Sequence, residues 1–494
     1  MLFTTARHFV RGPRCLSSFN RRRVPLPNVP LNLKEFKYVD KTHLLAKILS
    51  TEESTYILAP AMRRIGKSMT IDIMYEMAKG NRELFEGMAV NKPDSPFQIG
   101  AEQFFCIKLS FDTVSNESLS VIDNAERFNK RLVEAAKEQH GLVIEKDVCP
   151  GETLRSWIKA LTQDCNDKKI IMLIDEYDAP LTEFLPNSPE SATEVAKMVR
   201  PFYKTIKERH SQFHKVFVTG VSKFAATSMF SDANQFWPLM EKSADFSNLY
   251  GFTKREIIDT YGVEIGELFE GPLEDTIEKM SLMYNGYRFH PDQEELIYNP
   301  WSIISALKGR DLGAHWTNTA ASSTIIDTVG KHGMDVFHGI PIKKETLFAP
   351  VSATRYLENW EQVMFQTGYA TITDVVRRVE GDVDLVLRPP NQEVRQALMG
   401  GFADKLTNVV SDKTAIREYG KSLRRLDFKA AQDNLNKLFN SIKRHSLPES
   451  EAQLSGQIIS MLYQEPGFDL VYVDVPHKLD DEPTSNGWLI SNWI

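Results

Sequence analysis

Short apolar runs alternate with longer segments of helical character between residues 55 and 219. The clearest run, 170–174, has five consecutive apolar residues between charged neighbours, which is typical of a strand buried on both faces. Similar runs occur at 55–59, 104–109 and 215–219. Helices are expected at 67–79, 119–139 and 191–209. Strands that alternate with helices predict an α/β fold with a parallel, doubly wound sheet.

The pattern changes near residue 253, where it becomes mainly helical. Just before that point, residues 248–252 could supply a last edge strand of the sheet. Towards the end of the chain we expect a helical segment at 426–445 and one strand at 469–474.

Composition excludes several classes of protein. The chain has 494 residues, of which 42% are hydrophobic and 25% charged, so it is neither disordered throughout nor a coiled-coil rod. No run approaches 18 apolar residues, which excludes a membrane span. The four cysteines form no Cys-x-x-Cys pair, which argues against a disulfide framework and a structural zinc site. We expect a soluble protein from a reducing compartment.

Charge is distributed unevenly along the chain. Residues 1–34 contain seven basic side chains and no acidic one, as in a mitochondrial transit peptide. This predicts a mitochondrial matrix protein, with a disordered basic tail on a cytoplasmic protein as the alternative. The remaining residues hold 52 basic and 66 acidic side chains, a net charge of −14. Such an acidic body has no general attraction for nucleic acid.

The most specific motif is Arg63-Arg-Ile-Gly-Lys-Ser68, between the first predicted strand and the first predicted helix. A strand, a tight loop and Gly-Lys-Ser at a helix start supply the backbone N–H groups and the cation that bind phosphates. Lys67 would reach the β- and γ-phosphates and the Ser68 hydroxyl would bind Mg²⁺. The motif departs from its usual form because Ala61 stands where a glycine is expected. The predicted nucleotide-binding residues are Arg63, Arg64, Ile65, Gly66, Lys67, Ser68 and Met69.

Asp175 and Glu176 directly follow the buried strand 170–174. Asp175 suits an acid that holds Mg²⁺, and Glu176 suits one that activates the attacking water, although such a pair can also begin an exposed loop. ATPases with an additional strand between the two motif strands carry this Asp-Glu pair, and 215–219 would be that strand. Thr219 at its end could contact the attacking water or the γ-phosphate, with Ser222 in reserve, or Thr219 could cap the strand.

Nine blocks of sequence together resemble the AAA-ATPase-like family, whose members are often fused to a PD-(D/E)XK nuclease domain. The blocks are Tyr38-Val-Asp-Lys-Thr42, Arg63–Ser68, Leu173-Ile-Asp-Glu-Tyr-Asp178, Phe217–Phe224, Gly251-Phe-Thr253, Tyr284–Phe289, Tyr298-Asn-Pro300, His315-Trp-Thr-Asn-Thr319 and Pro390-Asn-Gln-Glu-Val394. The chain departs from the family at Ala61-Met62, where Arg-Pro is usual. No Glu-x-Lys strand follows Asp474, so we expect a truncated or absent nuclease half.

The resemblance implies an ATP-binding P-loop protein with Mg²⁺ that hydrolyses ATP to ADP and phosphate and acts as a nucleotide-driven switch. A nucleotide-binding interaction module with weak or no hydrolysis, and an ATPase component of a nucleic-acid-processing system, are the alternatives. A protein partner or self-association is expected. The predicted parts are a transit-like extension and linker (1–34), a P-loop ATPase-like domain (35–255), a helical lid or winged-helix-like region (256–395) and a small α+β nuclease-like remnant (396–494).

Some polar residues near the motifs fit more than one role. Arg63 and Arg64 could touch phosphates or lie on a solvated loop face, and Asp178 could orient the acids, although surface exposure is the favoured interpretation. Arg288, Lys254 and Arg255 could sense the γ-phosphate or form ordinary salt bridges.

Overall fold

The structure is a computed structural model that describes residues 37–441 with short gaps. The gaps are 53, 101–102, 113, 115, 117, 145–148, 164–167, 186–188, 224–235, 317–334, 353–354, 357, 379–380 and 408–412. The basic segment 1–34 and the predicted strand 469–474 lie outside the described residues. Within the described part of the chain, no helix is both long and apolar enough to cross a membrane.

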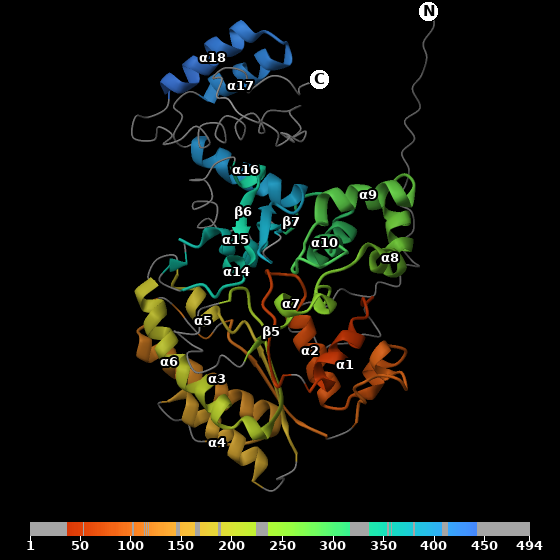
Figure 1. Ribbon diagram of the computed structural model, residues 1–494, viewed down its shortest axis with the longest axis vertical. Coiled ribbons are helices and arrows are strands. Elements are labelled where there is room, and N and C mark those ends of the chain that lie inside the picture. Colours follow the sequence, from red (N-terminus) through yellow and green to blue (C-terminus); the bar gives the residue numbers. More distant parts are fainter. Residues whose placement is uncertain are drawn as a thin grey trace, which may run out of the picture.

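A five-stranded parallel sheet forms the centre of the first half of the chain (Figure 1). Its strands are β1 (Tyr56–Leu58), β2 (Phe105–Ser110), β3 (Ile170–Asp175), β4 (Phe213–Val218) and β5 (Trp237–Pro238). Their order is β2-β3-β4-β1-β5, so β4 lies between β1 and β3. The four strands predicted from apolar runs are therefore confirmed, and so is the parallel α/β sheet.

The predicted edge strand at 248–252 is wrong. The edge beside β1 is occupied by the two-residue strand β5, whereas Phe252 forms only an isolated bridge with Tyr298. An apolar run of five residues fits a turn packed on the core as well as a strand, and only the long-range pairing decides between them.

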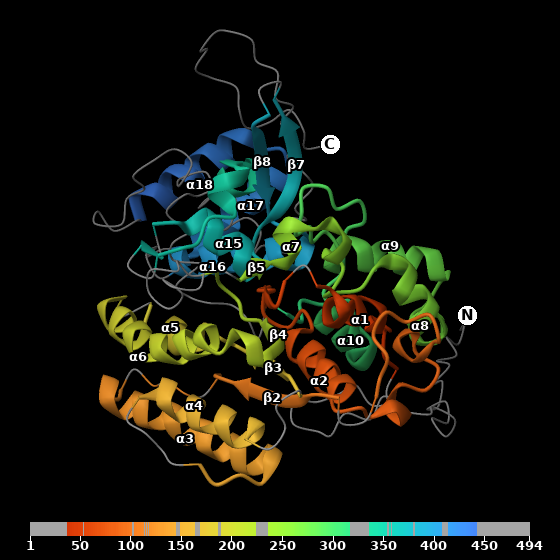
Figure 2. The same cartoon turned by 60° about the horizontal axis from the view of Figure 1, so that its bottom comes forward.

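Alternate residues of β3 enter two separate hydrophobic cores, because successive side chains of a strand point to opposite faces. Ile171 and Leu173 belong to the core that contains α1 (Thr42–Ser50) and α2 (Lys67–Ala78). The other residues, Ile170, Met172 and Ile174, belong to the core built with α3 (Val121–His140), α4 (Pro150–Thr162) and α6 (Pro189–Glu208). Figure 2 shows these helix groups on the two sides of the sheet. All six residues of β3 are buried, as the uninterrupted apolar run predicts.

Helix starts carry local signals that explain their positions. In α3, the Ser120 side chain accepts the N–H of Asp123 and the Asp123 carboxylate accepts the N–H of Ser120, which is a capping box. Thr253 and Glu256 form the same arrangement at α8 (Lys254–Leu268). These caps satisfy N–H groups that the first helical turn leaves without partners.

The second half of the chain is not only helical. After α8, α9 (Leu273–Tyr284) and α10 (Pro300–Gly309), it forms an antiparallel sheet in the order β6-β8-β7. The strands are β6 (Ile340–Lys343), β7 (Thr371–Arg377) and β8 (Val383–Arg388). This sheet was not among the elements predicted from the sequence, although the β-branched residues of 371–376 and the Gly-Asp pair at 381–382 are signals of a hairpin.

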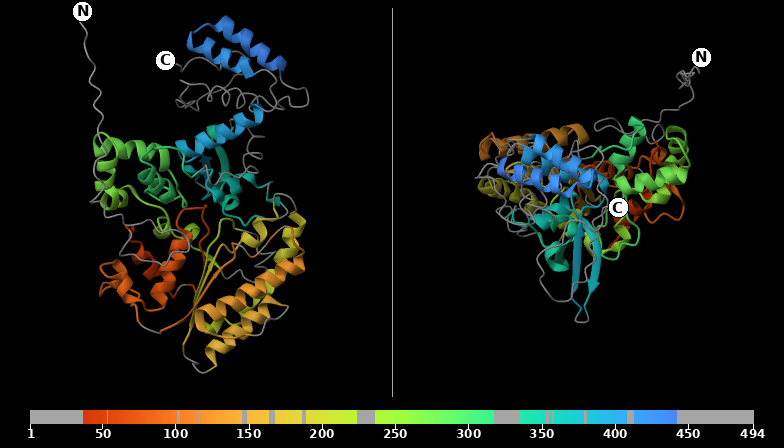
Figure 3. Two further views of the ribbon diagram at one scale, coloured as in Figure 1. Left: turned by 180° about the vertical axis from the view of Figure 1, so that it is seen from behind. Right: turned by 90° about the horizontal axis from the view of Figure 1, so that it is seen from above.

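The remaining helices are short or lie near the end of the described chain. They are α5 (Ala179–Thr182), α7 (Leu239–Lys242), α13 (Asp335–His338), α14 (Lys344–Leu347), α15 (Trp360–Thr367), α16 (Gln392–Thr407), α17 (Lys413–Arg424) and α18 (Phe428–Ser441). Figure 3 shows α17 and α18 side by side, at the opposite end of the molecule from α3 and α4. The helix predicted at 426–445 is thus present as α18.

The buried position of β3 leads to a stability prediction. Ile171→Ala should lower the free energy of unfolding by about 2–5 kcal/mol, because Ile171 is fully buried in the core between α2 and the neighbouring strands. The same substitution at Ile122, whose side chain is 74% exposed in α3, should change it by less than about 0.5 kcal/mol. Urea unfolding of both variants measures the difference, and equal losses would contradict the assignment of β3 to the core.

Candidate functional site

The loop between β1 and α2 ends at Gly66, whose φ of 112° is in the left-handed region. A Cβ at this position would meet no atom within 4 Å, so the backbone conformation and not space requires glycine. Helix α2 begins at the next residue, and no side chain in the described structure caps it. The first N–H groups of a helix and its dipole then favour an anion at this end.

Lys67 folds back over this loop. Its ammonium group donates a hydrogen bond to the Met62 carbonyl oxygen at 3.1 Å and lies 3.7 Å from Oε1 of Glu176. The Lys67 side chain is only 2% exposed, whereas that of Glu176 is 27% exposed. The predicted cation and the predicted acid, 109 positions apart in the chain, therefore face each other at the carboxyl edge of the sheet.

Asp175 ends β3 beside the start of α2. Burial raises the pKa of its carboxyl to about 6, and the Ser68 side chain, close enough to interact with the carboxylate, lowers the pKa by a smaller amount. The predicted metal-binding pair, Ser68 and Asp175, is thus adjacent in the structure. Mg²⁺ commonly takes one or two protein oxygens and completes its shell with water and phosphate oxygens, which these two side chains fit. No group of three or more His, Cys, Asp or Glu side chains that could hold a metal occurs among the described residues.

Glu176 adopts a left-handed backbone conformation with φ of 50°. For a residue with a Cβ this conformation costs about 1–2 kcal/mol. The Glu176 N–H donates to Oδ1 of Asp175 at 3.0 Å, and the next N–H, of Tyr177, donates to the Thr219 carbonyl oxygen at 3.0 Å. Strain held by surrounding hydrogen bonds is typical of functional sites.

Thr219 lies immediately after β4, between the loop and the acids. Its buried hydroxyl donates to the Ala59 carbonyl oxygen at 2.8 Å and is 3.2 Å from the Tyr250 hydroxyl. These contacts join the ends of β1 and β4, which is the strand-capping role. A contact of Thr219 with water or phosphate stays a prediction. The reserve candidate, Ser222, is buried and its N–H donates to Asp178.

The favoured interpretation of Asp178 as an exposed residue is wrong, because it is 1% exposed. Its carboxylate accepts the N–H groups of Val221 and Ser222 at 3.0 and 2.7 Å. A Cβ at Gly220 would clash with the same carboxylate. Burial and the nearby charge of Glu176 raise the pKa of Asp178 to about 7. Asp178 therefore holds the segment after β4 against the acids.

One signal in the sequence could have placed Asp178 in the interior. It is followed by Ala179-Pro180-Leu181, so the chain after the acids turns back into apolar surroundings. Pro180 and Leu181 are buried in α5.

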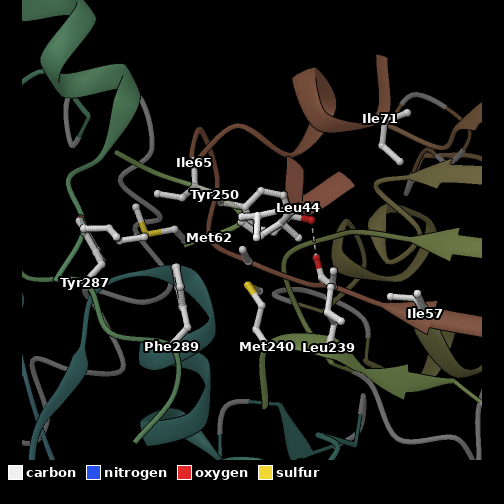
Figure 4. Close-up of a cluster of buried hydrophobic side chains, with 14 of the residues drawn as sticks. Leu44, Ile57, Met62, Ile65, Ile71, Leu239, Met240, Tyr250, Tyr287 and Phe289 are labelled. Carbon is white, nitrogen blue, oxygen red and sulfur yellow. Dashed lines mark hydrogen bonds between the residues drawn. The ribbon is translucent and has the colours of Figure 1, made fainter. Parts of the chain in front are cut away.

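The other predicted residues of the loop point in different directions. Ile65 is fully buried, and so is Met62, which was not a predicted site residue; Figure 4 shows both in a hydrophobic cluster with Tyr250. Arg63 is exposed, whereas the guanidinium of Arg64 lies 4.2 Å from the centre of the Trp301 ring. Met69 is half-buried in the first turn of α2.

One of the candidate lid cations makes another contact: Arg255 forms an exposed ion pair with Asp259 along α8. Arg288 is held through its backbone, whose N–H donates to the Thr371 hydroxyl at 2.8 Å, while its side-chain Nε is buried with no hydrogen-bond partner within the described structure.

The raised pKa values of the buried acids predict how stability depends on pH. The pKa of Asp175, about 6, and that of Asp178, about 7, lie above the ordinary value of 3.8. The folded protein therefore keeps protons that the unfolded chain has released, and its free energy of unfolding should fall as pH rises between about 4 and 7. In Asp178→Asn the side chain has no carboxyl group to titrate, so the free energy of unfolding should fall less as pH rises. Urea unfolding at several pH values measures it, with the exposed Asp94→Asn as control. An unchanged slope in Asp178→Asn would refute the assignment.

One protein family and one known protein match large parts of this chain. Residues 30–230 match the family described as predicted AAA-ATPase. An "Uncharacterized protein in vnfD 5'region" of Azotobacter chroococcum mcd 1 is 25% identical over 372 residues, which cover 74% of this chain and 66% of that protein. This chain thus spans just under two thirds of the length of its relative. The resemblance predicted from the motifs is confirmed: residues 30–230 of this chain, which contain both the loop and the acids after β3, match the AAA-ATPase-like family.

Proposed function

We propose that this protein binds Mg-ATP between the start of α2 and the end of β3, and hydrolyses it. The observation that carries the proposal is the contact of Lys67 with Glu176 beside the adjacent side chains of Ser68 and Asp175. A phosphate-binding loop, a cation, a metal-binding pair and a carboxylate that can accept a proton from water are the parts that phosphoryl transfer requires. The family match supports ATP as the nucleotide. The position of β4 between β1 and β3 supports the additional-strand, Asp-Glu class of P-loop proteins.

Each side chain has a defined part in this proposal. The N–H groups of the loop and the Lys67 ammonium would bind phosphate oxygens, while the Ser68 hydroxyl and the Asp175 carboxylate would hold Mg²⁺. When bound, Mg²⁺ neutralises charge on the phosphates. Glu176 orients a water molecule and accepts its proton as the water attacks the γ-phosphorus, while the bond from that phosphorus to the oxygen shared with the β-phosphate breaks and ADP leaves.

The contacts of Lys67 supply a simple response to nucleotide. In the structure its ammonium is satisfied by the Met62 carbonyl and Glu176. A triphosphate offers stronger, charged acceptors, so Lys67 exchanges these partners for phosphate and Glu176 is released to act on water. A rearrangement of this kind is what a nucleotide-driven switch needs, and the region after residue 253 would transmit it to a protein partner or a second copy.

Several finer parts of the proposal still rest on sequence. The lid or winged-helix-like character of 256–395, the nuclease-like remnant at 396–494 and the mitochondrial matrix destination suggested by residues 1–34 are predictions. The acidic body argues against a nucleic-acid partner.

Replacing Lys67 tests nucleotide binding. Lys67→Ala should weaken Mg-ATP binding by about 10- to 100-fold, because a charge-assisted contact with phosphate contributes about 1.5–3 kcal/mol. The control is Lys79→Ala, since Lys79 is exposed directly after the other end of α2. Isothermal titration of residues 31–494 measures both. Equal affinity of the two variants would place the nucleotide elsewhere.

Replacing Glu176 separates an ATPase from a module that only binds nucleotide. Glu176→Gln should keep the affinity for Mg-ATP but reduce the hydrolysis rate by about 100-fold or more, because the amide cannot accept a proton. Glu183→Gln, a change at an exposed position of the same segment, is the control. Phosphate release is the measurement. If Glu176→Gln leaves turnover unchanged, the interaction-module alternative is favoured, and stimulation by DNA would favour the nucleic-acid-processing alternative.

A further inference from the structure

Three consecutive residues of the phosphate-binding loop are held by segments that come much later in the chain. The Ile65 carbonyl oxygen accepts the N–H of Gly251 at 3.1 Å. Arg64 stacks on Trp301, the second residue of α10. The Arg63 carbonyl oxygen accepts a hydrogen bond from Nε1 of Trp316 at 3.0 Å. The conformation of the loop is therefore determined partly by the second half of the chain.

Trp316 is itself held by a buried acid, Glu393 of α16. Oε1 of Glu393 accepts the backbone N–H groups of His315 and Trp316, both at 2.5 Å, and Oε2 accepts the Ser302 hydroxyl at 2.7 Å. Glu393 has no exposed surface. These donors offset the cost of burying the carboxylate, which is high without hydrogen bonds. The Trp316 ring also packs against Tyr369, with ring centres 5.4 Å apart.

The loop needs external support because its own sequence gives little. Arg64 and Gly66 both have positive φ angles, of 64° and 112°, and a left-handed arginine is strained. Ala61 replaces the glycine that such loops usually have, and Met62 is packed tightly enough that a Cβ at Gly368 would lie 2.5 Å from its sulfur. Contacts from other segments must therefore hold the loop in shape.

We propose that Trp316, held in place by Glu393, is a positioning residue that presets the phosphate-binding loop through the Arg63 carbonyl. The inference rests on the proposed function and extends it, since it names a route between the nucleotide and the second half of the chain. Coupling of this kind is reciprocal: if Trp316 and α16 favour the loop shape that binds phosphate, bound phosphate stabilises their arrangement by the same free energy.

Trp316→Phe tests the proposal because it keeps an aromatic ring against Tyr369 but removes the Nε1 donor. Loss of one hydrogen bond should weaken Mg-ATP binding and raise KM by about fivefold. The value of kcat should stay within about twofold, because Lys67, Asp175 and Glu176 are unchanged. Titration calorimetry and steady-state phosphate release measure the two effects.

The matched control is Trp157→Phe. Trp157 of α4 is as fully buried as Trp316, but its ring nitrogen has no hydrogen-bond partner within the described structure. Thermal unfolding without nucleotide gives the purely structural cost of each change. If Trp316 only packs in the core, both variants should lose similar stability and keep the wild-type Kd, and that result would overturn the proposal.

A second variant covers the case in which Trp316→Phe does not fold. Glu393→Gln keeps the shape of the side chain but weakens the hydrogen bonds that it accepts from the N–H groups of His315 and Trp316. Like Trp316→Phe, it should therefore raise the Kd for Mg-ATP. An unchanged Kd in a folded Glu393→Gln protein would refute the role of Glu393. Failure of this proposal can be told apart from failure of the proposed function. If the wild-type protein does not bind Mg-ATP, the proposed function fails. If the wild-type protein binds Mg-ATP and the variants bind it equally well, the positioning role fails.

Discussion

The candidate site depends on the hydrogen bonds that the segment after β4 makes to both of its neighbours. The Gly220 carbonyl accepts the N–H of Ala61 at 2.9 Å, and the Thr219 carbonyl accepts that of Tyr177 at 3.0 Å. These bonds continue the parallel register in which Val218 is level with Leu58 of β1 and with Ile174 of β3. A slip of one residue in this register would turn every side chain of the strand to the opposite face of the sheet. The observed register is therefore the one that brings Lys67, at the start of α2, to Asp175 and Glu176 at the end of β3.

Strain and buried charge are concentrated around this segment. Arg64, Gly66 and Glu176 have positive φ angles, and Asp175 and Asp178 are buried with raised pKa values. Such an arrangement costs stability, and it persists because two well-packed cores on either face of the sheet hold the strands in place. The strained and buried charged residues, which destabilise the protein, therefore lie apart from the two hydrophobic cores that stabilise it.

The second half of the chain is an integral part of the site. The core that contains residues of α1 and α2 also contains residues of β6, β8 and α16, so the antiparallel sheet shares one hydrophobic core with the helix that follows the loop. Contacts from Gly251, Trp301 and Trp316 reach the loop across this core. A displacement of the loop would change the packing of the second half, which gives the proposed switch a physical connection.

The sequence alone determined four of the five strands of the parallel sheet, the start of α2 at Lys67 and the pairing of the loop with Asp175 and Glu176. These features follow from local periodicity and from motifs whose chemistry needs particular residues. It did not determine that β5 would be the edge strand, that the second half would contain a sheet, that Asp178 would be buried or that Trp316 would reach the loop. Each of these depends on contacts between residues far apart in the chain, which hydrophobic pattern and local spacing do not encode, so only the tertiary structure decided them.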